Sequence, residues 1–269
     1  MTIRYDRSFG VAAPELGWVP SPNFALRRAA ILDWMKGMPP GRVLEVGCGA
    51  GALLYELARR GFNGLGVETS DAARSVAGRI LAGNDSMAIA ATLPAAAAPA
   101  FDYLMAFEVL EHVERDRDAL ADWIRHLKPA GTVFLSLPAH RRRWNETDLA
   151  AGHFRRYDRP DAVRLVEDAG LRIRRIGTCG WPASRPIEWL RLWATRRALR
   201  RQHVDAAGIG RGDRDRTAAS GIDRRLESRL YPFYASMPMR WAFDAAMALQ
   251  RPFYDTSLGV SFLVVARKP

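Results

Sequence analysis

Short apolar runs alternate with amphipathic stretches through the middle of the chain. Four apolar runs have the length and composition of buried strands, namely RVLEVG, NGLGVE, FDYLMAF and TVFLSL. Helical patterns separate or follow these runs, namely ALLYELARRG, SDAARSVAGRILAG and DRDALADWIRHLK, the last of which begins near Asp116. Strands that alternate with helices predict right-handed crossovers and a parallel sheet. The pattern therefore predicts a doubly wound α/β sandwich.

The pattern changes outside this alternating region and divides the chain into four parts. Residues 1–40 hold one helical pattern, NFALRRAAILDWMKGM, which a Pro-Pro-Gly run ends. Residues 41–177 contain the alternating region and finish with the helix DAVRLVEDAG and the strand LRIRRIG. Residues 178–256 read as helices and loops with a polar linker at 203–224, and residues 257–269 add the strand VSFLVVAR. We predict an N-terminal helical cap, a core, a helical insertion or lid, and a final core strand.

A glycine-rich loop follows the first predicted strand. Gly47, Gly49 and Gly51 stand between that strand and the next helical pattern. Glycine permits a tight turn and a close approach of the backbone to a ligand, and the N–H groups at a helix start favour a polar or negative ligand group. Glu68 ends the next strand, about 20 residues further on, where a carboxylate can accept hydrogen bonds from two ribose hydroxyls. These features together predict a site for a nucleoside-containing ligand.

The spacing of the glycines separates two classes of nucleoside site. A dinucleotide site expects G-x-G-x-x-G, whereas this loop has G-x-G-x-G, with Glu45 two residues before the first glycine. This pattern resembles motif I of the class I S-adenosylmethionine-dependent methyltransferases. The segments FDYLMAFEVLEHV and HLKPAGTVFLSLP are similar to the fourth and fifth strand regions of that superfamily, and G-H-x-R-R-Y resembles a bacterial branch of it. The resemblance covers residues 43 to about 176 and the final strand.

The resemblance implies a Rossmann-like sandwich with a seven-stranded, mostly parallel sheet, and S-adenosylmethionine as the cofactor. In the family the loop approaches the methionine and ribose parts of the cofactor, and the acid after the second strand holds the ribose. Many relatives use an aspartate for the adenine, but this chain has Ala90, Ala91 and Thr92 in that region, so Thr92 or backbone groups would replace it. The cofactor-binding residues that the resemblance implies are Glu45, Gly47, Cys48, Gly49, Gly51, Glu68, Thr69, Thr92, Phe107, Glu108 and His112.

The segment after the fifth strand is predicted to form the acceptor side of the site. It is long, polar and aromatic, PAHRRRWNETDLAAGHFRRYDR, and such connections at strand ends often carry function. Methyl transfer to oxygen usually requires a general base. We predict His153 as this base, with Tyr157 and His140 as further catalytic candidates. The alternative is that His153 and Tyr157 only brace the loop, beside arginines paired to acids such as Asp148.

A metal-assisted mechanism is a second reading of the E-V-L-E-H-V segment. Glu108, Glu111 and His112 have i, i+3 and i+4 spacing, which places them on one face of a helical turn. Small-RNA 2′-O-methyltransferases carry a similar arrangement with a downstream histidine. The pattern also occurs without a metal, and a hard cation requires more oxygen ligands than this segment offers. We therefore predict no resident metal ion.

Charge and composition restrict the partners. The formal net charge is +11, and only Lys36, Lys128 and Lys268 are lysines, which is typical of an arginine-rich composition. No nucleic-acid motif accompanies the arginines, so we do not expect a nucleic-acid partner. The insertion carries tryptophans among arginines, a composition compatible with peripheral membrane contact. It also carries a methionine- and aromatic-rich stretch that would suit the roof of an apolar acceptor pocket.

These observations favour O-methylation of a small or lipid-like acceptor. An RNA 2′-O-methyltransferase, metal-assisted or not, and a non-catalytic cofactor-binding partner protein are the alternatives. Cys48 and Cys179 are the two cysteines, and one lies in the glycine loop, so a disulfide is not expected. This cysteine content and the polar N-terminus favour the cytoplasm. The sequence makes no prediction about the oligomeric state.

Overall fold

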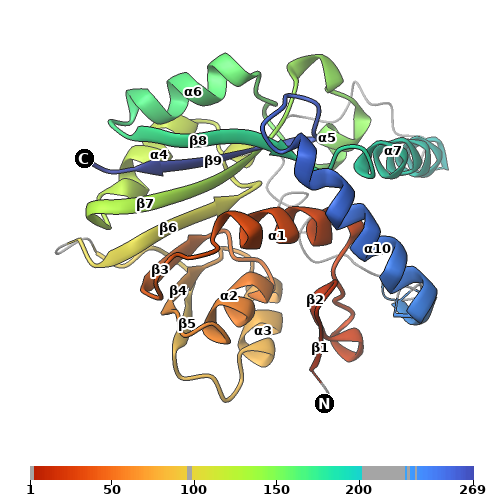
Figure 1. Ribbon diagram of the computed structural model, residues 1–269, viewed down its shortest axis with the longest axis horizontal. Coiled ribbons are helices and arrows are strands. Elements are labelled where there is room, and N and C mark those ends of the chain that lie inside the picture. The colour runs from red at the N-terminus through yellow and green to blue at the C-terminus, as the bar shows by residue number, and fades with distance from the viewer. Residues whose placement is uncertain (1–2, 96–98, 202–227, 229–230, 234) are drawn as a thin grey trace.

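A seven-stranded sheet forms the centre of the protein, as Figure 1 shows. The computed structural model describes residues 3–95, 99–201, 228, 231–233 and 235–269, and the linker predicted at 203–224 lies outside them. The strand order is β5-β4-β3-β6-β7-β9-β8. The strands are β3 (Arg42–Val46), β4 (Asn63–Val67), β5 (Met87–Ala90), β6 (Phe101–Phe107), β7 (Leu127–Pro138), β8 (Arg172–Cys179) and β9 (Ser261–Arg267).

All of the strands except β9 run parallel to one another. Each neighbouring pair is parallel in the series β5, β4, β3, β6 and β7. Strand β9 enters between β7 and β8 and pairs with both in the antiparallel sense. The seven-stranded, mostly parallel sheet that the resemblance implies is therefore confirmed, and its antiparallel strand is the last one.

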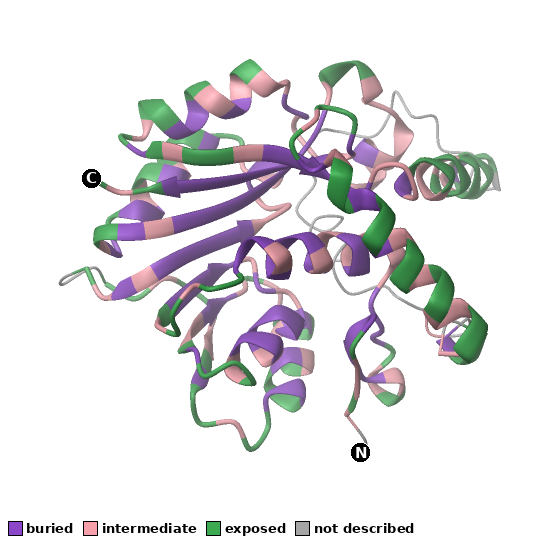
Figure 2. Ribbon diagram, in the orientation of Figure 1, coloured by how far each residue is buried: buried purple, intermediate pink, exposed green. Residues whose placement is uncertain are grey.

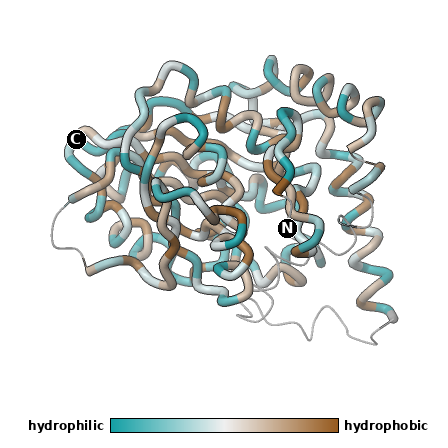
Figure 3. Tube along the Cα trace, turned by 90° about the horizontal axis from the view of Figure 1, so that it is seen from below, coloured by the Kyte–Doolittle hydropathy of each residue, from teal (hydrophilic) through white to brown (hydrophobic). Residues whose placement is uncertain are grey.

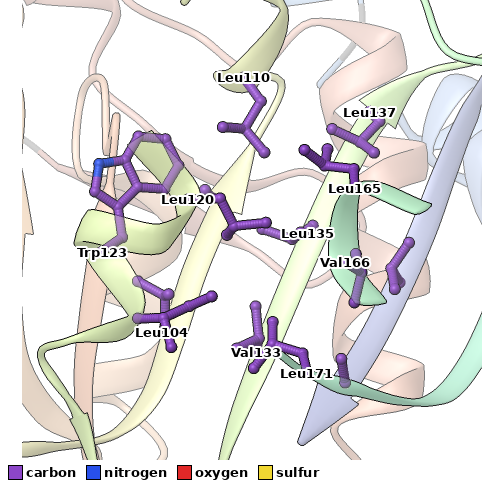
Figure 4. Packing of buried hydrophobic residues seen from close by; sticks show 14 of the residues in the cluster. Leu104, Leu110, Leu120, Trp123, Val133, Leu135, Leu137, Leu165, Val166 and Leu171 are labelled. Carbon is purple, nitrogen blue, oxygen red and sulfur yellow. The ribbon is translucent and has the colours of Figure 1, made fainter. Parts of the chain in front are cut away.

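Helices cover both faces of the sheet. Alternate strand residues point to opposite faces, so Val43 and Met105 pack with the helices of one side, and Leu44 and Leu104 with those of the other. Figure 4 shows the second side, where side chains of β6 and β7 meet Trp123 and other buried residues of neighbouring elements. The first side is covered by α1 (Pro22–Trp34), α2 (Ala52–Ala58) and α3 (Asp71–Ile80), and the second by α4 (Asp116–Ile124) and α6 (Arg159–Asp168).

The N-terminal region contains more than the predicted helix. Strands β1 (Arg4–Asp6) and β2 (Gly10–Ala12) form a two-stranded antiparallel hairpin before α1. Three-residue strands give no measurable alternation of polar and apolar residues, which is why the sequence pattern does not predict them. The hairpin contacts the insertion, because the Ser8 hydroxyl donates a 2.6 Å hydrogen bond to Asp244.

Three further helices gather beyond the carboxyl ends of the parallel strands. They are α5 (Glu146–Ala151), α7 (Ser184–Arg201) and α10 (Met237–Gln250). The helices α7 and α10 belong to the insertion between β8 and β9, at the end of the molecule away from the C-terminus (Figure 1). None of the described helices combines the length and apolar character needed to cross a bilayer.

Candidate functional site

A cavity of about 350 Å³ lies where the parallel strands β3, β4, β6 and β7 end. This is the edge of a doubly wound sheet at which ligands bind. The glycine loop, α1, the segment after β6, the α5 region and α7 all contribute to its walls. The predicted site residues that line it are Glu45, Gly47, Cys48, Gly49, Glu68, Thr69, Phe107, Glu108, His112 and His153.

The three glycines of the loop have different physical roles. Each has a positive φ, of 69° at Gly47, 54° at Gly49 and 70° at Gly51. A Cβ atom at Gly47 would lie 2.5 Å from a Val109 methyl group, so the loop packs closely against the segment after β6. Gly51 is the N-cap of α2 and faces Ala77 of α3, and it does not line the cavity. Gly51 therefore supports the loop instead of contacting a ligand directly.

Glu68 is held by the backbone at the edge of the cavity. Its two carboxylate oxygens accept hydrogen bonds from the amides of Gly49 and Ser70, each at 2.9 Å. A carboxylate oxygen has a second lone pair, so both oxygens can still accept a bond from a ligand hydroxyl. This geometry links the acid that the sequence assigns to a ribose with the glycine loop itself.

Glu45 is buried beside the cavity with one oxygen unsatisfied. Burial, together with the negative charge of Glu68, raises the pKa of Glu45 to about 8, and Arg27 opposes the shift. Among the described residues, Glu45 Oε2, Trp18 Nε1 and Asn23 Oδ1 are buried without a hydrogen-bond partner, and all three residues line the cavity. Buried polar atoms are almost always paired, so these atoms indicate a ligand that supplies both a donor and an acceptor.

His153 also lines the cavity and is paired with a buried carboxylate. Its Nδ1 is 3.0 Å from Asp148 Oδ1. Burial alone would raise the pKa of Asp148, but hydrogen bonds from His153 and Arg156 hold this pKa below its usual value. Asp148 is therefore ionised at neutral pH and accepts the Nδ1 proton of His153, which assigns Nε2 as the proton-accepting nitrogen.

The position of Asp148 follows from the local sequence. Asn145 and Asp148 form a reciprocal capping box at the start of α5, which fixes the Asp148 backbone and one carboxylate oxygen. Arg156 Nε donates a 2.7 Å hydrogen bond to the other oxygen. The carboxylate is buried and fully engaged, so it fixes the orientation of the His153 imidazole.

The E-V-L-E-H-V segment brings a second histidine and an acid close to His153. Glu111 is fully buried, and its burial and the neighbouring Glu108 raise its pKa well above the usual value. The His112 ring meets the His153 ring edge-on, with 4.6 Å between the ring centroids. Burial, and to a smaller extent the neighbouring His153, lowers the pKa of His112 to about 4. Ligand atoms of Glu111, His112 and His153 all lie within 4.8 Å of one another.

Two imidazoles and one carboxylate form a donor set that suits a first-row transition metal better than Mg²⁺ or Ca²⁺. The same three groups also fit a metal-free arrangement, in which the buried Glu111, whose pKa is raised, lies beside the two imidazoles. The absence of a resident metal ion stays a prediction that requires a direct test.

The structure does not bring every predicted residue to the cavity. The Tyr157 hydroxyl is buried and donates a 2.8 Å hydrogen bond to Asp116, and burial and this acid raise its pKa. His140 packs beside Phe262, outside the described cavity lining, and Thr92 is exposed at the surface. The geometry therefore gives no support to the catalytic roles predicted for Tyr157 and His140 or to the cofactor contact predicted for Thr92, and these stay predictions.

Residues that the sequence pattern did not single out complete the cavity. Trp18, Asn23 and Arg27 reach it from the N-terminal region, and Arg191 reaches it from α7. The two adjacent arginines within the largely apolar α1 sequence were the available signal. The other residues come together only through the tertiary fold.

Comparison with known proteins places this geometry in a family. A model described as "Methyltransferase domain" matches residues 24–176, which is more than half of the chain. The chain belongs to the methyltransferase domain family. This confirms the superfamily inferred from the glycine loop, while the bacterial branch inferred from G-H-x-R-R-Y remains a prediction.

Curated relatives of this methyltransferase share its core. A ubiquinone biosynthesis O-methyltransferase of Hahella chejuensis is 33% identical over 115 residues, covering 40% of this chain and 48% of the relative. One of Cronobacter sakazakii is 29% identical over 169 residues, covering 61% of this chain and 68% of the relative. The chain thus spans about half the length of the first curated relatives it matches.

Solved structures show the same fold at low identity. The [4+2]-cyclase SpnF aligns with a TM-score of 0.57 and 17% identity, covering 98% of this chain and 88% of the cyclase. A protein named as a cyclase on this fold shows that the fold alone does not determine the reaction. The reaction of this methyltransferase must therefore be inferred from its site.

Proposed function

We propose that this protein transfers the methyl group of S-adenosylmethionine to an oxygen atom of a small or lipid-like acceptor, with His153 as the general base. The observation that carries the proposal is that the Asp148–His153 pair and the glycine loop line one cavity. A cofactor site and a base in the same cavity are what a methyl transfer to a hydroxyl group requires.

The loop side of the cavity fits S-adenosylmethionine. Glu68 can accept hydrogen bonds from ribose hydroxyls while it holds the Gly49 amide. The unpaired acceptors on Glu45 and Asn23 suit the cofactor's ammonium group, and the Trp18 indole N–H suits its carboxylate. The cofactor supplies an electrophilic methyl group on a sulfonium.

The Asp148–His153 pair can remove a proton. The ionised Asp148 holds the proton on Nδ1 of His153, and Nε2 can therefore take the proton of an acceptor hydroxyl as the oxygen attacks the methyl group. Asp148 also stabilises the imidazolium that results. Positioned bases of this kind accelerate reactions by about 10²- to 10⁴-fold.

The cavity lining and the relatives support a compact acceptor with apolar character. Phe24, Leu26, Ile31 and Phe107 supply apolar surface beside the polar groups. Relatives named ubiquinone biosynthesis O-methyltransferase support oxygen as the methylated atom and a small molecule as the acceptor. A phenol or a related hydroxylated ring fits both observations.

The two alternatives predicted from the sequence receive less support. A non-catalytic partner would fill its acceptor pocket with side chains of the insertion, whereas Glu188 and Arg191 of α7 line the wall of an open cavity. An RNA enzyme would present a continuous basic groove, but three arginines of the lining, Arg27, Arg28 and Arg156, are each paired with an acid.

The decisive experiment compares two histidine variants. His153→Gln should lower kcat by about 10²- to 10⁴-fold on a hydroxylated aromatic acceptor, with an unchanged Kd for S-adenosylmethionine by calorimetry. His140→Gln is the matched control, because it changes a histidine outside the cavity, and it should retain activity. Normal turnover in His153→Gln would refute the base, and the absence of S-adenosylmethionine binding by the wild-type protein would refute the whole proposal.

A further inference from the structure

Polar contacts anchor helix α10 to the N-terminal region. Arg240 forms a 2.8 Å ion pair with Asp6, and Asp244, although exposed, accepts a 2.6 Å hydrogen bond from Ser8. Gln250 is buried and donates a 2.9 Å hydrogen bond to the Leu26 carbonyl. These contacts fix which face of α10 is turned to solvent.

The outward face of α10 carries large apolar side chains and one acid. Met237 and Trp241 are 55% and 66% exposed, and Ala245, Ala248 and Leu249 continue the exposed row toward the C-terminal end of the helix. Spacings of three and four residues place these side chains on one face, together with the exposed Asp244. Figure 2 shows exposed residues along α10, interrupted by half-buried and buried ones.

Helix α7 exposes aromatic and basic residues together. Trp189 and Trp193 are 69% and 52% exposed, and the Arg197 guanidinium lies 5.7 Å from the centre of the Trp193 ring. Arg200 is exposed one turn further, on the same side of the helix as Trp189 and Trp193. The side chain of Leu199 is buried on the other side, so the tryptophans are not part of the core.

Both helices lie at the same end of the molecule (Figure 1), and brown and teal segments alternate along the helices of that end in Figure 3. We name the outward residues of the two helices the α7–α10 surface. Its large apolar and basic members are Trp189, Leu190, Trp193, Arg197, Arg200, Met237, Trp241 and Leu249, and the exposed Asp244 also belongs to it. Soluble monomers rarely expose so many large apolar side chains together, and such patches mark interaction sites.

We propose that the α7–α10 surface binds the surface of an anionic lipid bilayer. Tryptophan rings favour the boundary between headgroups and acyl chains, and arginines beside them bind anionic headgroups. The charge of this surface favours an anionic partner, because the exposed Arg197 and Arg200 stand on the same side of α7 as Trp189 and Trp193. The net charge of +11 acts in the same direction.

Membrane contact at this surface would place the cavity next to the bilayer. Glu188 and Arg191 line the cavity and belong to the helix that carries the exposed tryptophans. An acceptor dissolved in the headgroup region could then enter without crossing bulk water. The binding argument does not depend on the proposed methyl transfer, because it uses no residue assigned to catalysis.

Vesicle flotation with the full chain tests the proposal. Vesicles of phosphatidylglycerol and phosphatidylcholine in equal parts should bind the protein at least tenfold more tightly than vesicles of phosphatidylcholine alone. The variant W189S/W193S/W241S should lose at least tenfold in binding, and R197Q/R200Q should lose the preference for the anionic vesicles. The control R117Q/R125Q removes the same charge from exposed positions on and beside α4 and should bind like the wild type.

Calorimetry with S-adenosylmethionine shows whether each variant is folded, and its result separates this proposal from the proposed function. Absence of binding to the anionic vesicles, or full binding by the folded tryptophan variant, would overturn the proposal. A concentration-dependent dimer that the tryptophan substitutions abolish would also overturn it, because the surface would then serve a second copy.

Discussion

Glu45→Gln should change how the affinity for S-adenosylmethionine depends on pH. In the unliganded protein the pKa of Glu45 is raised to about 8, because the carboxyl group is buried and faces Glu68. A cationic group of the cofactor would instead favour the ionised carboxylate. Binding near neutral pH must therefore release the proton that Glu45 carries.

The size of the effect follows from the pKa. Ionising Glu45 at pH 7 costs about 1.4 kcal/mol when its pKa is about 8. If the bound carboxylate stays ionised, the affinity should rise by up to tenfold per pH unit and by about 50-fold between pH 6 and pH 8, with little change above that. The cofactor's own amino group titrates with a pKa of about 8, so a matched variant is needed to separate the two groups.

The stability of the unliganded protein gives a second test of the raised pKa of Glu45. Below pH 4.5 Glu45 carries its proton in both the folded and the unfolded chain. Between pH 4.5 and about pH 8 the unfolded chain has lost this proton, whereas the folded chain keeps it. The stability of the wild type should therefore fall as pH rises through this window, by at most about 5 kcal/mol. Glu45→Gln should lack this fall.

Isothermal titration in phosphate and Tris buffers at pH 6, 7 and 8 measures both the affinity and the protons released. The wild type should release a proton that Glu45→Gln does not, and the variant should bind more weakly at pH 8, where its neutral amide cannot form an ion pair with a cation. Equal proton release by the two proteins would refute the role of Glu45, as would a wild-type affinity that does not change with pH.

Three further predictions test other parts of the site. Glu68→Ala removes the acceptor of the Gly49 and Ser70 amides and should weaken S-adenosylmethionine binding by at least tenfold, whereas Glu68→Gln should weaken it less. Calorimetry that gives Glu68→Ala the same affinity as the wild type would reject the ribose contact. Gly47→Ala should lower the free energy of unfolding by about 3 kcal/mol, because the cost of a positive φ is added to the cost of a clash with Val109 at 2.5 Å. Gly49→Ala should lower it by only about 1–2 kcal/mol, since nothing lies within 4 Å of the added Cβ atom. Denaturant unfolding of the pair checks this, and similar losses would contradict it. Activity should survive chelation and should not rise with added Mg²⁺, Mn²⁺ or Zn²⁺; activity that one cation restores and Glu111→Gln abolishes would assign a metal to Glu111, His112 and His153.

The core of the fold was predictable because its signals are local. Alternating strands and helices leave a periodicity that survives in a single sequence, and the glycine loop fixes where a ligand approaches. The seven-stranded, mostly parallel sheet came from the family resemblance, whereas the strand order and the place of the last strand between β7 and β8 came from the structure. The N-terminal hairpin escaped prediction because strands of three residues have no periodicity to read.

The limits of sequence reading at the site are physical as well. His140, His153 and Tyr157 lie within one polar segment, and the sequence gives no sign of which side chain faces the cavity. The fold separates them through contacts from distant parts of the chain, since Tyr157 finds Asp116 and His153 finds Asp148. Trp18 reaches the cavity from a segment outside the recognised motifs, and only the fold reveals its unpaired indole.

The antiparallel strand β9 has a consequence for how such proteins diversify. Cys179 at the end of β8 is paired with Ser261 at the start of β9, so the insertion leaves and re-enters the sheet at adjacent positions. The entropic cost of closing a loop grows only slowly with its length. The roughly 80 residues between these two positions can therefore be lengthened, shortened or exchanged without disturbing the strand register. Acceptor choice and surface attachment can thus evolve as an exchangeable module, while the half of the cavity that holds the methyl donor stays constant.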